Sequence, residues 1–257
     1  MKLYIVTGAT RGLGKALVEA LARDPANEII TLSRAADASM GQIRNYQIEL
    51  ARLAEIAAVF GRAMDNCALP HYDKIVLYNN AGVLEPVGPL TMCDDAQIET
   101  ALQVNLAAPI ILMRHFIART RAMCDARLIV NISSGAGRRP VAAWTMYCAT
   151  KAGLDMATRV AGLEAERFEP GLSVCSVAPG VVDTSMQERV RAVAADVFPD
   201  VVRFRKMKEE GKLRTPEEAS AILLEFEAAG AFQNGGIHDV REMSHAAPAA
   251  PVAADRM

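Results

Sequence analysis

The chain has 257 residues, of which 51% are hydrophobic and 23% are charged. This is the composition of a globular protein with one large domain or two small ones, and it excludes a disordered chain. The formal net charge of −2 gives no reason to expect nucleic acid or an anionic membrane as a partner.

The elements predicted along the chain alternate between strand and helix, because short apolar runs indicate buried strands and helically spaced apolar residues indicate helices. The first half predicts a strand at 3–7, a helix at 12–23, strands at 28–33 and 46–50, a helix at 53–64 and a strand at 75–79. The second half predicts a helical pattern at 94–121 that Pro109 interrupts, a strand at 128–133, a helix at 144–168, a strand at 172–178, a helix at 216–229 and a strand at 237–240. This alternation predicts an α/β domain with a doubly wound parallel sheet of about seven strands and helices on both faces.

Two stretches lie outside this alternation. The stretch 182–214 has no strand pattern and is rich in charged residues and methionine, which predicts helices over one rim of the sheet. The stretch 246–257 is rich in alanine and proline and predicts a disordered tail.

The cysteines and the apolar runs indicate the cellular compartment in which the protein is expected. The five cysteines are widely spaced and form no C-x-x-C pair, which indicates neither a disulfide framework nor a zinc site. Only a short apolar run follows Met1-Lys2, unlike a signal peptide, and we expect no apolar stretch long enough to span a bilayer. The four histidines show no ligand spacing. We therefore expect a reduced, cytoplasmic protein without a metal site.

Tyr147 and Lys151 are four residues apart in the predicted helix 144–168, so their side chains share one face. A phenol is a weak acid with a reference pKa of about 10, and a neighbouring ammonium group lowers that pKa. The pair is therefore expected to exchange a proton with a substrate oxygen near neutral pH. The alternative is that both are ordinary residues of an amphipathic helix.

A glycine-rich turn lies between the first predicted strand and the first predicted helix, with the sequence Thr7-Gly8-Ala9-Thr10-Arg11-Gly12-Leu13-Gly14. Glycines there allow the backbone to approach a pyrophosphate, and the helix N-terminus offers unpaired N–H groups. The turn predicts a dinucleotide site, and the alternative is a plain connection.

The end of the second predicted strand indicates which dinucleotide is bound. An NAD site has an acidic residue there, which binds the ribose 2′-hydroxyl. Here the strand ends with Leu32-Ser33-Arg34, and Arg11 lies in the glycine-rich turn. Two guanidinium groups would clamp a 2′-phosphate, so we predict NADP(H). The alternative is that both arginines are only solvated.

With these features the chain resembles the short-chain dehydrogenase/reductase family over roughly residues 2–243. Besides the glycine-rich turn, four motifs carry the resemblance in the family's order: Asn79-Asn80-Ala81-Gly82, Val104-Asn105, Asn131-Ile132-Ser133-Ser134 and Pro179-Gly180-Val181-Val182-Asp183-Thr184. Ser134 lies 13 residues before Tyr147, the family's spacing, which selects it over Ser133.

The resemblance implies a single Rossmann-type domain at 1–245, with a substrate-covering helical segment near 185–214. It implies Tyr147 as the proton donor, Lys151 as the residue that lowers its pKa and holds the nicotinamide ribose, Ser134 as the hydrogen-bond donor to the carbonyl, and Asn105 as the holder of a water that links Lys151 to solvent. The implied NADP(H) contacts are Gly8, Thr10, Arg11, Gly12, Leu13, Gly14, Ser33, Arg34, Glu49, Leu50, Asn80, Ala81, Gly82, Tyr147, Lys151, Pro179, Gly180, Val182 and Thr184. Glu49 departs from the family's pattern, which has an aspartate there against the adenine.

Within the family, the resemblance is greatest to the branch of the sepiapterin reductases and the bacterial benzil reductases. In that branch an aspartate near the C-terminus anchors the substrate, and Asp239 is the matching position. Leu84, Trp144, Met186 and Phe204 would line an apolar pocket for a flat carbonyl compound, or else belong to the core.

The resemblance therefore implies an NADPH-dependent reduction of a ketone or 1,2-diketone, carried out by a homodimer or a tetramer. Two alternatives stay open. One is the reduction of 3-oxoacyl thioesters, and the other is a non-catalytic protein that senses NADP.

Overall fold

The predicted strands form one parallel sheet in the order β3-β2-β1-β4-β5-β6-β7 in the computed structural model, which describes residues 1–35, 43–68 and 71–243. The strands are β1 (Lys2–Thr7), β2 (Asn27–Ser33), β3 (Arg44–Gln47), β4 (Lys74–Asn79), β5 (Arg127–Ile132), β6 (Leu172–Ala178) and β7 (Ile237–Asp239). The predicted fold class is thus confirmed. The order reverses between β1 and β4, and ligands of such sheets bind at the carboxyl ends of the strands beside this point.

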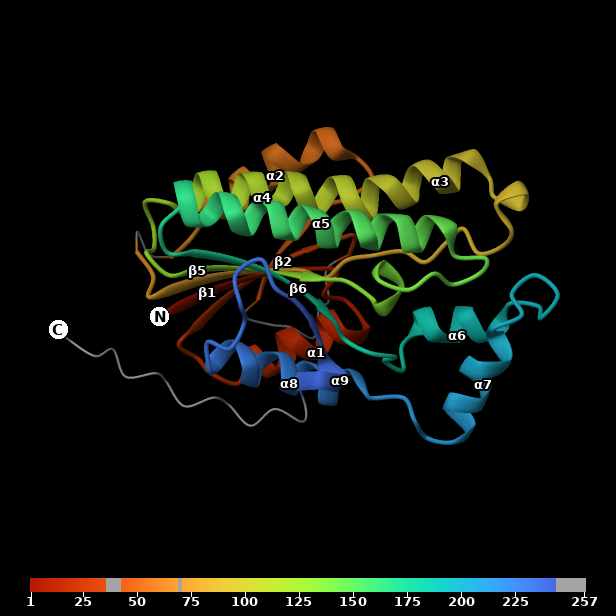
Figure 1. Ribbon diagram of the computed structural model, residues 1–257. Helices are drawn as coiled ribbons and strands as arrows, with labels where there is room; N and C mark the ends of the chain where they lie inside the picture. Colours follow the sequence, from red (N-terminus) through yellow and green to blue (C-terminus); the bar gives the residue numbers. More distant parts are fainter. Residues whose placement is uncertain (36–42, 69–70, 244–257) are drawn as a thin grey trace.

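Helices cover both faces of the sheet (Figure 1). On one face lie α1 (Gly12–Leu21), α8 (Pro216–Ala228) and α9 (Val240–Met243), and on the other lie α2 (Leu53–Asp65), α4 (Ala108–Thr120) and α5 (Thr145–Phe168). Successive residues of β1 show why both faces need covering. Leu3 and Ile5 belong to the core under α2 and α4, whereas Tyr4 and Val6 belong to the core under α1 and α8. A parallel strand buried on both sides must be apolar at every position.

The long helical pattern at 94–121 is continuous but irregular. It consists of α3 (Asp95–Leu102), a π-helical turn η3 (Gln103–Ala107) and α4. The predicted interruption at Pro109 is therefore displaced into the turn before it. Proline lacks an N–H and crowds the preceding turn, and a widened π turn accommodates both effects.

This run also corrects the expectation about apolar stretches. Asp95–Thr120 is long and apolar enough to cross a membrane by length and composition, which we did not expect. In the fold it packs beside α2 and α5 over the sheet, and 44% of its most apolar stretch is buried. The buried part of the run contributes to the core, whereas Leu102 and Ile110 stay exposed.

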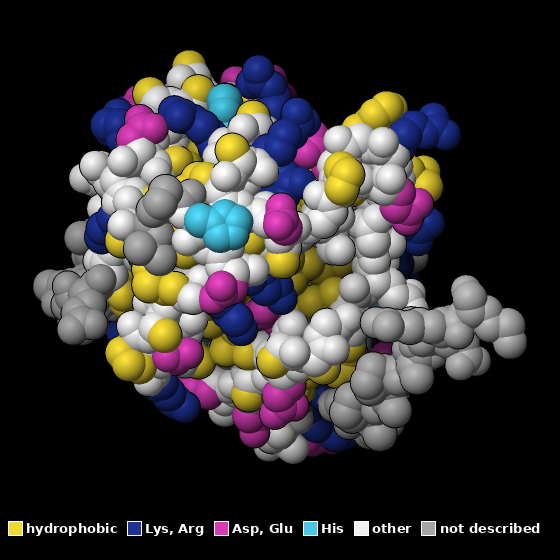
Figure 2. Space-filling view, turned by 90° about the vertical axis from the view of Figure 1, so that its left-hand side faces the viewer, with side chains coloured by type: hydrophobic (Ala, Val, Ile, Leu, Met, Phe, Trp, Pro, Cys, Tyr) yellow, Lys and Arg dark blue, Asp and Glu magenta, His cyan; other side chains and the backbone are white. Residues whose placement is uncertain are grey.

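The segment 182–214 contains two helices, α6 (Ser185–Ala192) and α7 (Val201–Glu209), which lie beyond the carboxyl ends of the strands (Figure 1). Val182 and Arg214 close the segment with an isolated parallel bridge. The opposite face of the molecule, at the amino ends of the strands, mixes acidic, basic and apolar side chains (Figure 2). The predicted tail 246–257 and residues 244–245 lie outside the described residues.

Candidate functional site

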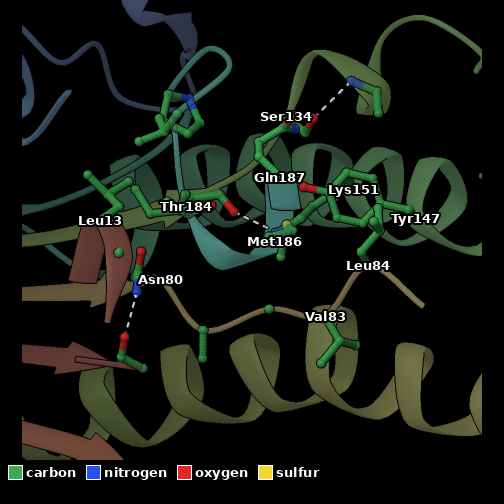
Figure 3. Close-up of a pocket in the computed structure, with 18 of the residues that line it drawn as sticks. Leu13, Asn80, Val83, Leu84, Ser134, Tyr147, Lys151, Thr184, Met186 and Gln187 are labelled. Carbon is green, nitrogen blue, oxygen red and sulfur yellow. Dashed lines mark hydrogen bonds between the residues drawn. The ribbon is translucent and has the colours of Figure 1, made fainter. Parts of the chain in front are cut away.

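A cavity of about 720 Å³ opens at the carboxyl ends of the central strands. Figure 3 shows Leu13 and Asn80 at one end, and Tyr147, Lys151 and Leu84 at the other. Of the site residues named from the sequence, all but Gly14 and Asn105 line this cavity. Residues that the motifs did not reveal also line it, including Val83, Arg139, Gln187 and Arg241. These lie in loops, in α6 and in α9, where no residue pattern distinguishes them.

The glycine-rich turn has the backbone that its sequence requires. Gly8 and Gly12 have φ of +67° and +55°, a region that favours glycine. A Cβ on Gly14 would lie 2.3 Å from the Gly8 carbonyl oxygen and 2.4 Å from Nδ2 of Asn80. That Nδ2 donates to the carbonyls of Thr7 (2.9 Å) and Gly8 (3.1 Å). Gly14 is therefore needed to pack the helix onto the turn, although it does not line the cavity.

The start of α1 fits a pyrophosphate. Its N-cap is Arg11, whose side chain caps no backbone N–H, and Gly12 and Leu13 line the cavity directly after it. The backbone N–H of Ala9 is occupied by Ser33 Oγ at 3.0 Å. Uncapped N–H groups at a helix N-terminus favour an anion, so the residues present fit the phosphates of a dinucleotide.

Arg11 and Arg34 both line the cavity and are exposed. The Arg34 guanidinium lies 3.9 Å from the Glu49 carboxylate, and the Arg34 carbonyl accepts a hydrogen bond from Gln47 at 2.9 Å. An exposed ion pair of this length holds a guanidinium only weakly.

Tyr147 and Lys151 lie on one face of α5, as expected, and both are buried. The Lys151 Nζ donates to the Ile132 carbonyl at 2.7 Å and lies 5.8 Å from the centre of the Tyr147 ring. Burial lowers the pKa of Lys151 to about 8, against the opposing charge of Asp155.

The pKa of Tyr147 differs from our expectation. Burial raises this pKa, and the Ser134 hydroxyl offsets the rise only in part. The spacing of Tyr147 and Lys151 indicated that the ammonium would lower it, but spacing does not reveal how far a phenol is removed from water.

Asn105 lies in the π-helical turn and is nearly inaccessible to solvent. Its Oδ1 accepts from the Val83 N–H and its Nδ2 donates to the Val83 carbonyl, each at 2.8 Å. A Cβ on Gly82 would lie 3.3 Å from the Asn105 Oδ1 and 3.7 Å from the Lys151 Nζ. Asn105 thus fixes the backbone beside Lys151 without lining the cavity.

An aromatic cluster forms the wall beside Tyr147. The Trp144 ring stacks on Phe198 with centroids 5.3 Å apart, packs on Phe204 at 5.4 Å and meets the Tyr147 ring edge-on at 5.5 Å. Leu84 and Met186 pack against the same cluster. Both predictions for these side chains, pocket and core, therefore apply. The side chains pack in a core and also line the cavity. Phe198 was not identified from the sequence.

Asp239, the expected substrate anchor, lies at the end of β7 with only 1% of its surface exposed. Its carboxylate is bound by Arg138 and Arg241. Among residues 1–35, 43–68 and 71–243, no three His, Cys, Asp or Glu side chains are grouped as metal ligands would be.

The family model of the short chain dehydrogenases matches residues 2–194. The chain is 37% identical to a benzil reductase ((S)-benzoin forming) of Bacillus subtilis, over 94% of this chain and 99% of that one. It is 31% identical to the sepiapterin reductase of Rattus norvegicus, over 90% and 93% of the two chains. Among solved structures, the KRED1-Pglu enzyme superposes with a TM-score of 0.79 at 30% identity, over 92% and 100% of the two chains.

Proposed function

The chain belongs to the short chain dehydrogenase family of oxidoreductases, and on that premise we propose that it reduces a ketone or 1,2-diketone carbonyl with NADPH. The single observation that carries this proposal is the arrangement of one cavity, lined by Ser134, Tyr147 and Lys151 at one end and by a phosphate-binding turn at the other. A dinucleotide bound along the cavity would present its nicotinamide to these side chains, and this cofactor supplies the hydride.

Each side chain at the reactive end has its own role in proton delivery. The raised pKa of Tyr147 keeps its hydroxyl protonated at neutral pH, which suits a proton donor in reduction. The Ser134 Oγ accepts from the Ala136 N–H at 3.2 Å, and its hydroxyl interacts with Tyr147, from which it would turn to the carbonyl oxygen of the substrate. Lys151, with a pKa of about 8, is mostly an ammonium at pH 7 and would hold the nicotinamide ribose. Asn105 would hold the backbone and a water beside it.

The choice of NADPH over NADH rests on the adenosine end of the cavity. Arg11 and Arg34 both line it, and the end of β2 carries no acidic residue for a ribose 2′-hydroxyl. The weak pairing of Arg34 with Glu49 leaves its guanidinium able to turn toward a 2′-phosphate. Glu49 and Leu50 would lie against the adenine.

The aromatic wall supports a flat substrate. Trp144 contacts the Tyr147 ring directly, so an aromatic substituent on the carbonyl would stack beside the proton donor. The two bacterial relatives named as benzil reductases are 37% and 30% identical to this chain, which fits an aryl ketone or diketone. A solved 3-ketoacyl-(acyl-carrier-protein) reductase shares the fold at 19% identity, which does not favour the 3-oxoacyl alternative over an aryl ketone. The alternative of an NADP sensor is disfavoured because Ser134, Tyr147 and Lys151 all line the cavity.

A panel of carbonyl compounds tests the proposal. We expect the purified protein to oxidise NADPH in the presence of benzil, with slower turnover of sepiapterin and isatin and little with acetoacetyl thioesters. NADPH should bind at least about tenfold more tightly than NADH in a fluorescence titration, because each charge-assisted hydrogen bond contributes roughly 1.5–3 kcal/mol. Equal affinities would contradict the NADP assignment, and tight cofactor binding without turnover of any carbonyl would favour the sensor.

We also propose that the protein is a homodimer that pairs through the outer side of α3, α4 and α5. Exposed apolar side chains collect on these adjacent helices: Leu102, Ile110, Met156, Val160 and Leu163. Several exposed apolar side chains on neighbouring helices are typical of an interface.

Leu163→Glu should dissociate this dimer, because Leu163 is 68% exposed in the single chain and a charge there would be buried on pairing. The measurement is the molar mass by light scattering after size-exclusion chromatography. The matched control is Val202→Glu on α7, which is 61% exposed and lies away from these helices, and which should leave the mass unchanged. A monomeric wild-type protein would contradict the proposal, and a wild-type tetramer should fall to a smaller species with Leu163→Glu.

A further inference from the structure

Asp239 is a buried carboxylate whose hydrogen-bonding capacity is already used. Its Oδ2 accepts from Arg138 Nη2 at 2.7 Å and from Arg241 Nη2 at 2.5 Å. Its Oδ1 accepts from Arg241 Nε at 2.8 Å and from the Arg241 backbone N–H at 3.1 Å. Burial by itself would raise the pKa of Asp239, but the hydrogen bonds and charges of the two arginines lower it overall. The group is therefore a carboxylate held by two cations, and a substrate would have to displace one of them.

Arg138 connects this carboxylate to the serine of the reactive end. It directly follows the one-turn helix η4 (Gly135–Gly137), whose N-cap is Ser134. The Gly137 N–H donates to the Ser134 carbonyl at 3.0 Å, and the Arg138 N–H donates to the Gly135 carbonyl at 3.1 Å. Ser134 through Arg138 is thus a single hydrogen-bonded turn, with the Ser134 hydroxyl at its start and the bond to Asp239 at its end.

On the side away from Asp239, the same turn packs closely against α5. A Cβ on Gly137 would lie 2.8 Å from Asp155 Oδ2 and 3.0 Å from the Lys151 carbonyl oxygen. Asp155 is itself fixed, because its Oδ1 accepts from the Ser176 hydroxyl of β6 at 2.6 Å. The turn therefore lies between α5, which carries Tyr147, and β7, which carries Asp239.

We propose that Asp239 and Arg138 form a clamp that positions the Ser134 hydroxyl relative to Tyr147, and that Asp239 is a positioning residue rather than a contact of the substrate. This inference rests on the proposed function, in which Ser134 donates to the carbonyl. It replaces the expected anchoring role of Asp239 for a physical reason. A carboxylate that accepts four hydrogen bonds from two arginines has little left to offer a ligand.

The test is a double-mutant cycle between Asp239→Asn and Ser134→Ala. Asp239→Asn keeps the shape of the side chain but removes its charge, so Arg138 is released. We expect kcat for benzil to fall on the order of 10–100-fold, as a displaced catalytic group commonly costs, with NADPH affinity unchanged. In the Ser134→Ala background the same change should cost less than about twofold, because there is no hydroxyl left to position.

A second variant separates the clamp from a general loss of stability. Arg138→Met should reproduce the loss seen in Asp239→Asn, and Arg138→Lys should restore part of it. The matched control is Glu169→Gln, since Glu169 is likewise held by two arginines, Arg121 and Arg127, but at the far end of α5. Glu169→Gln should leave kcat unchanged. Independent, additive losses from Asp239→Asn and Ser134→Ala would overturn the clamp.

A substrate anchor would behave differently from a clamp. Its loss would raise KM for sepiapterin, spare benzil and persist in the Ser134→Ala background, and this result would also overturn the proposal. Hydrogen exchange gives a readout that needs no turnover. The amides of Ala136, Gly137 and Arg138 should exchange faster in Asp239→Asn than in Glu169→Gln, and equal exchange would refute the clamp even if the wild-type protein reduces none of the carbonyls.

Discussion

Replacing Tyr147 by phenylalanine is expected to lower kcat for the best carbonyl substrate by about a thousandfold or more, within the range that general acid catalysis contributes. The change removes only the hydroxyl, and the ring that meets Trp144 edge-on at 5.5 Å stays in place. NADPH affinity and the melting temperature should therefore be close to those of the wild-type protein. The measurements are the steady-state rate of NADPH oxidation, a fluorescence titration of NADPH and a thermal melt.

Tyr46→Phe provides the control for loss of a phenol elsewhere. Tyr46 lies on the edge strand β3, is partly buried against the core and does not line the cavity. Its replacement should leave kcat within about twofold of the wild-type value, since surface and edge substitutions away from a site have small effects. Turnover that survives Tyr147→Phe would remove Tyr147 from the mechanism and leave Ser134 as the group that interacts with the carbonyl.

The strands were predictable from two signals in the sequence, an apolar run and a turn residue soon after it. Leu3 to Val6 and Ile75 to Tyr78 are short continuous apolar runs, typical of a parallel strand buried on both faces, and a glycine or an asparagine follows closely after each one. The third strand shows the limit of this signal. It was expected at 46–50 but is Arg44–Gln47. Ile48 and Leu50 lie after the strand, where they pack in the core beside α2 and also line the cavity. An apolar residue does not reveal which surface buries it.

Contacts between distant parts of the chain were not predictable from the sequence. Arg138 and Asp239 are 101 residues apart and neither belongs to a local motif. Phe198 reaches Trp144 only because α6 and α7 extend beyond the sheet. The prediction of a lowered Tyr147 pKa was wrong for the same reason. The spacing to Lys151 determines only the helix face, whereas burial depends on every element around the phenol.

Gly14→Ala is the second substitution with a large expected effect. A Cβ there would lie 2.3 Å from the Gly8 carbonyl oxygen and 2.4 Å from Asn80 Nδ2. Neither atom is able to move aside easily, because Asn80 is bonded to the Thr7 and Gly8 carbonyls and the Gly8 N–H donates to Leu32 at 2.9 Å. The helix α1 would have to move away from the turn. We expect the free energy of unfolding to fall by about 3 kcal/mol, the cost of forcing atoms into a packed region.

The same displacement should weaken NADPH binding by about 100-fold or more, because the N–H groups of α1 and the turn would no longer surround one phosphate position. Denaturant unfolding followed by circular dichroism and fluorescence titration measure the two effects. Gly61→Ala is the control, since Gly61 lies inside α2 and a Cβ there would meet only the end of the flexible Arg119 side chain at 2.9 Å. That substitution should be neutral or stabilise the protein by up to about 1 kcal/mol, as alanine does in a helix. If Gly14→Ala bound NADPH as the wild-type protein does, the glycine-rich turn would be a structural connection and the cofactor would have to be held by the rest of the cavity.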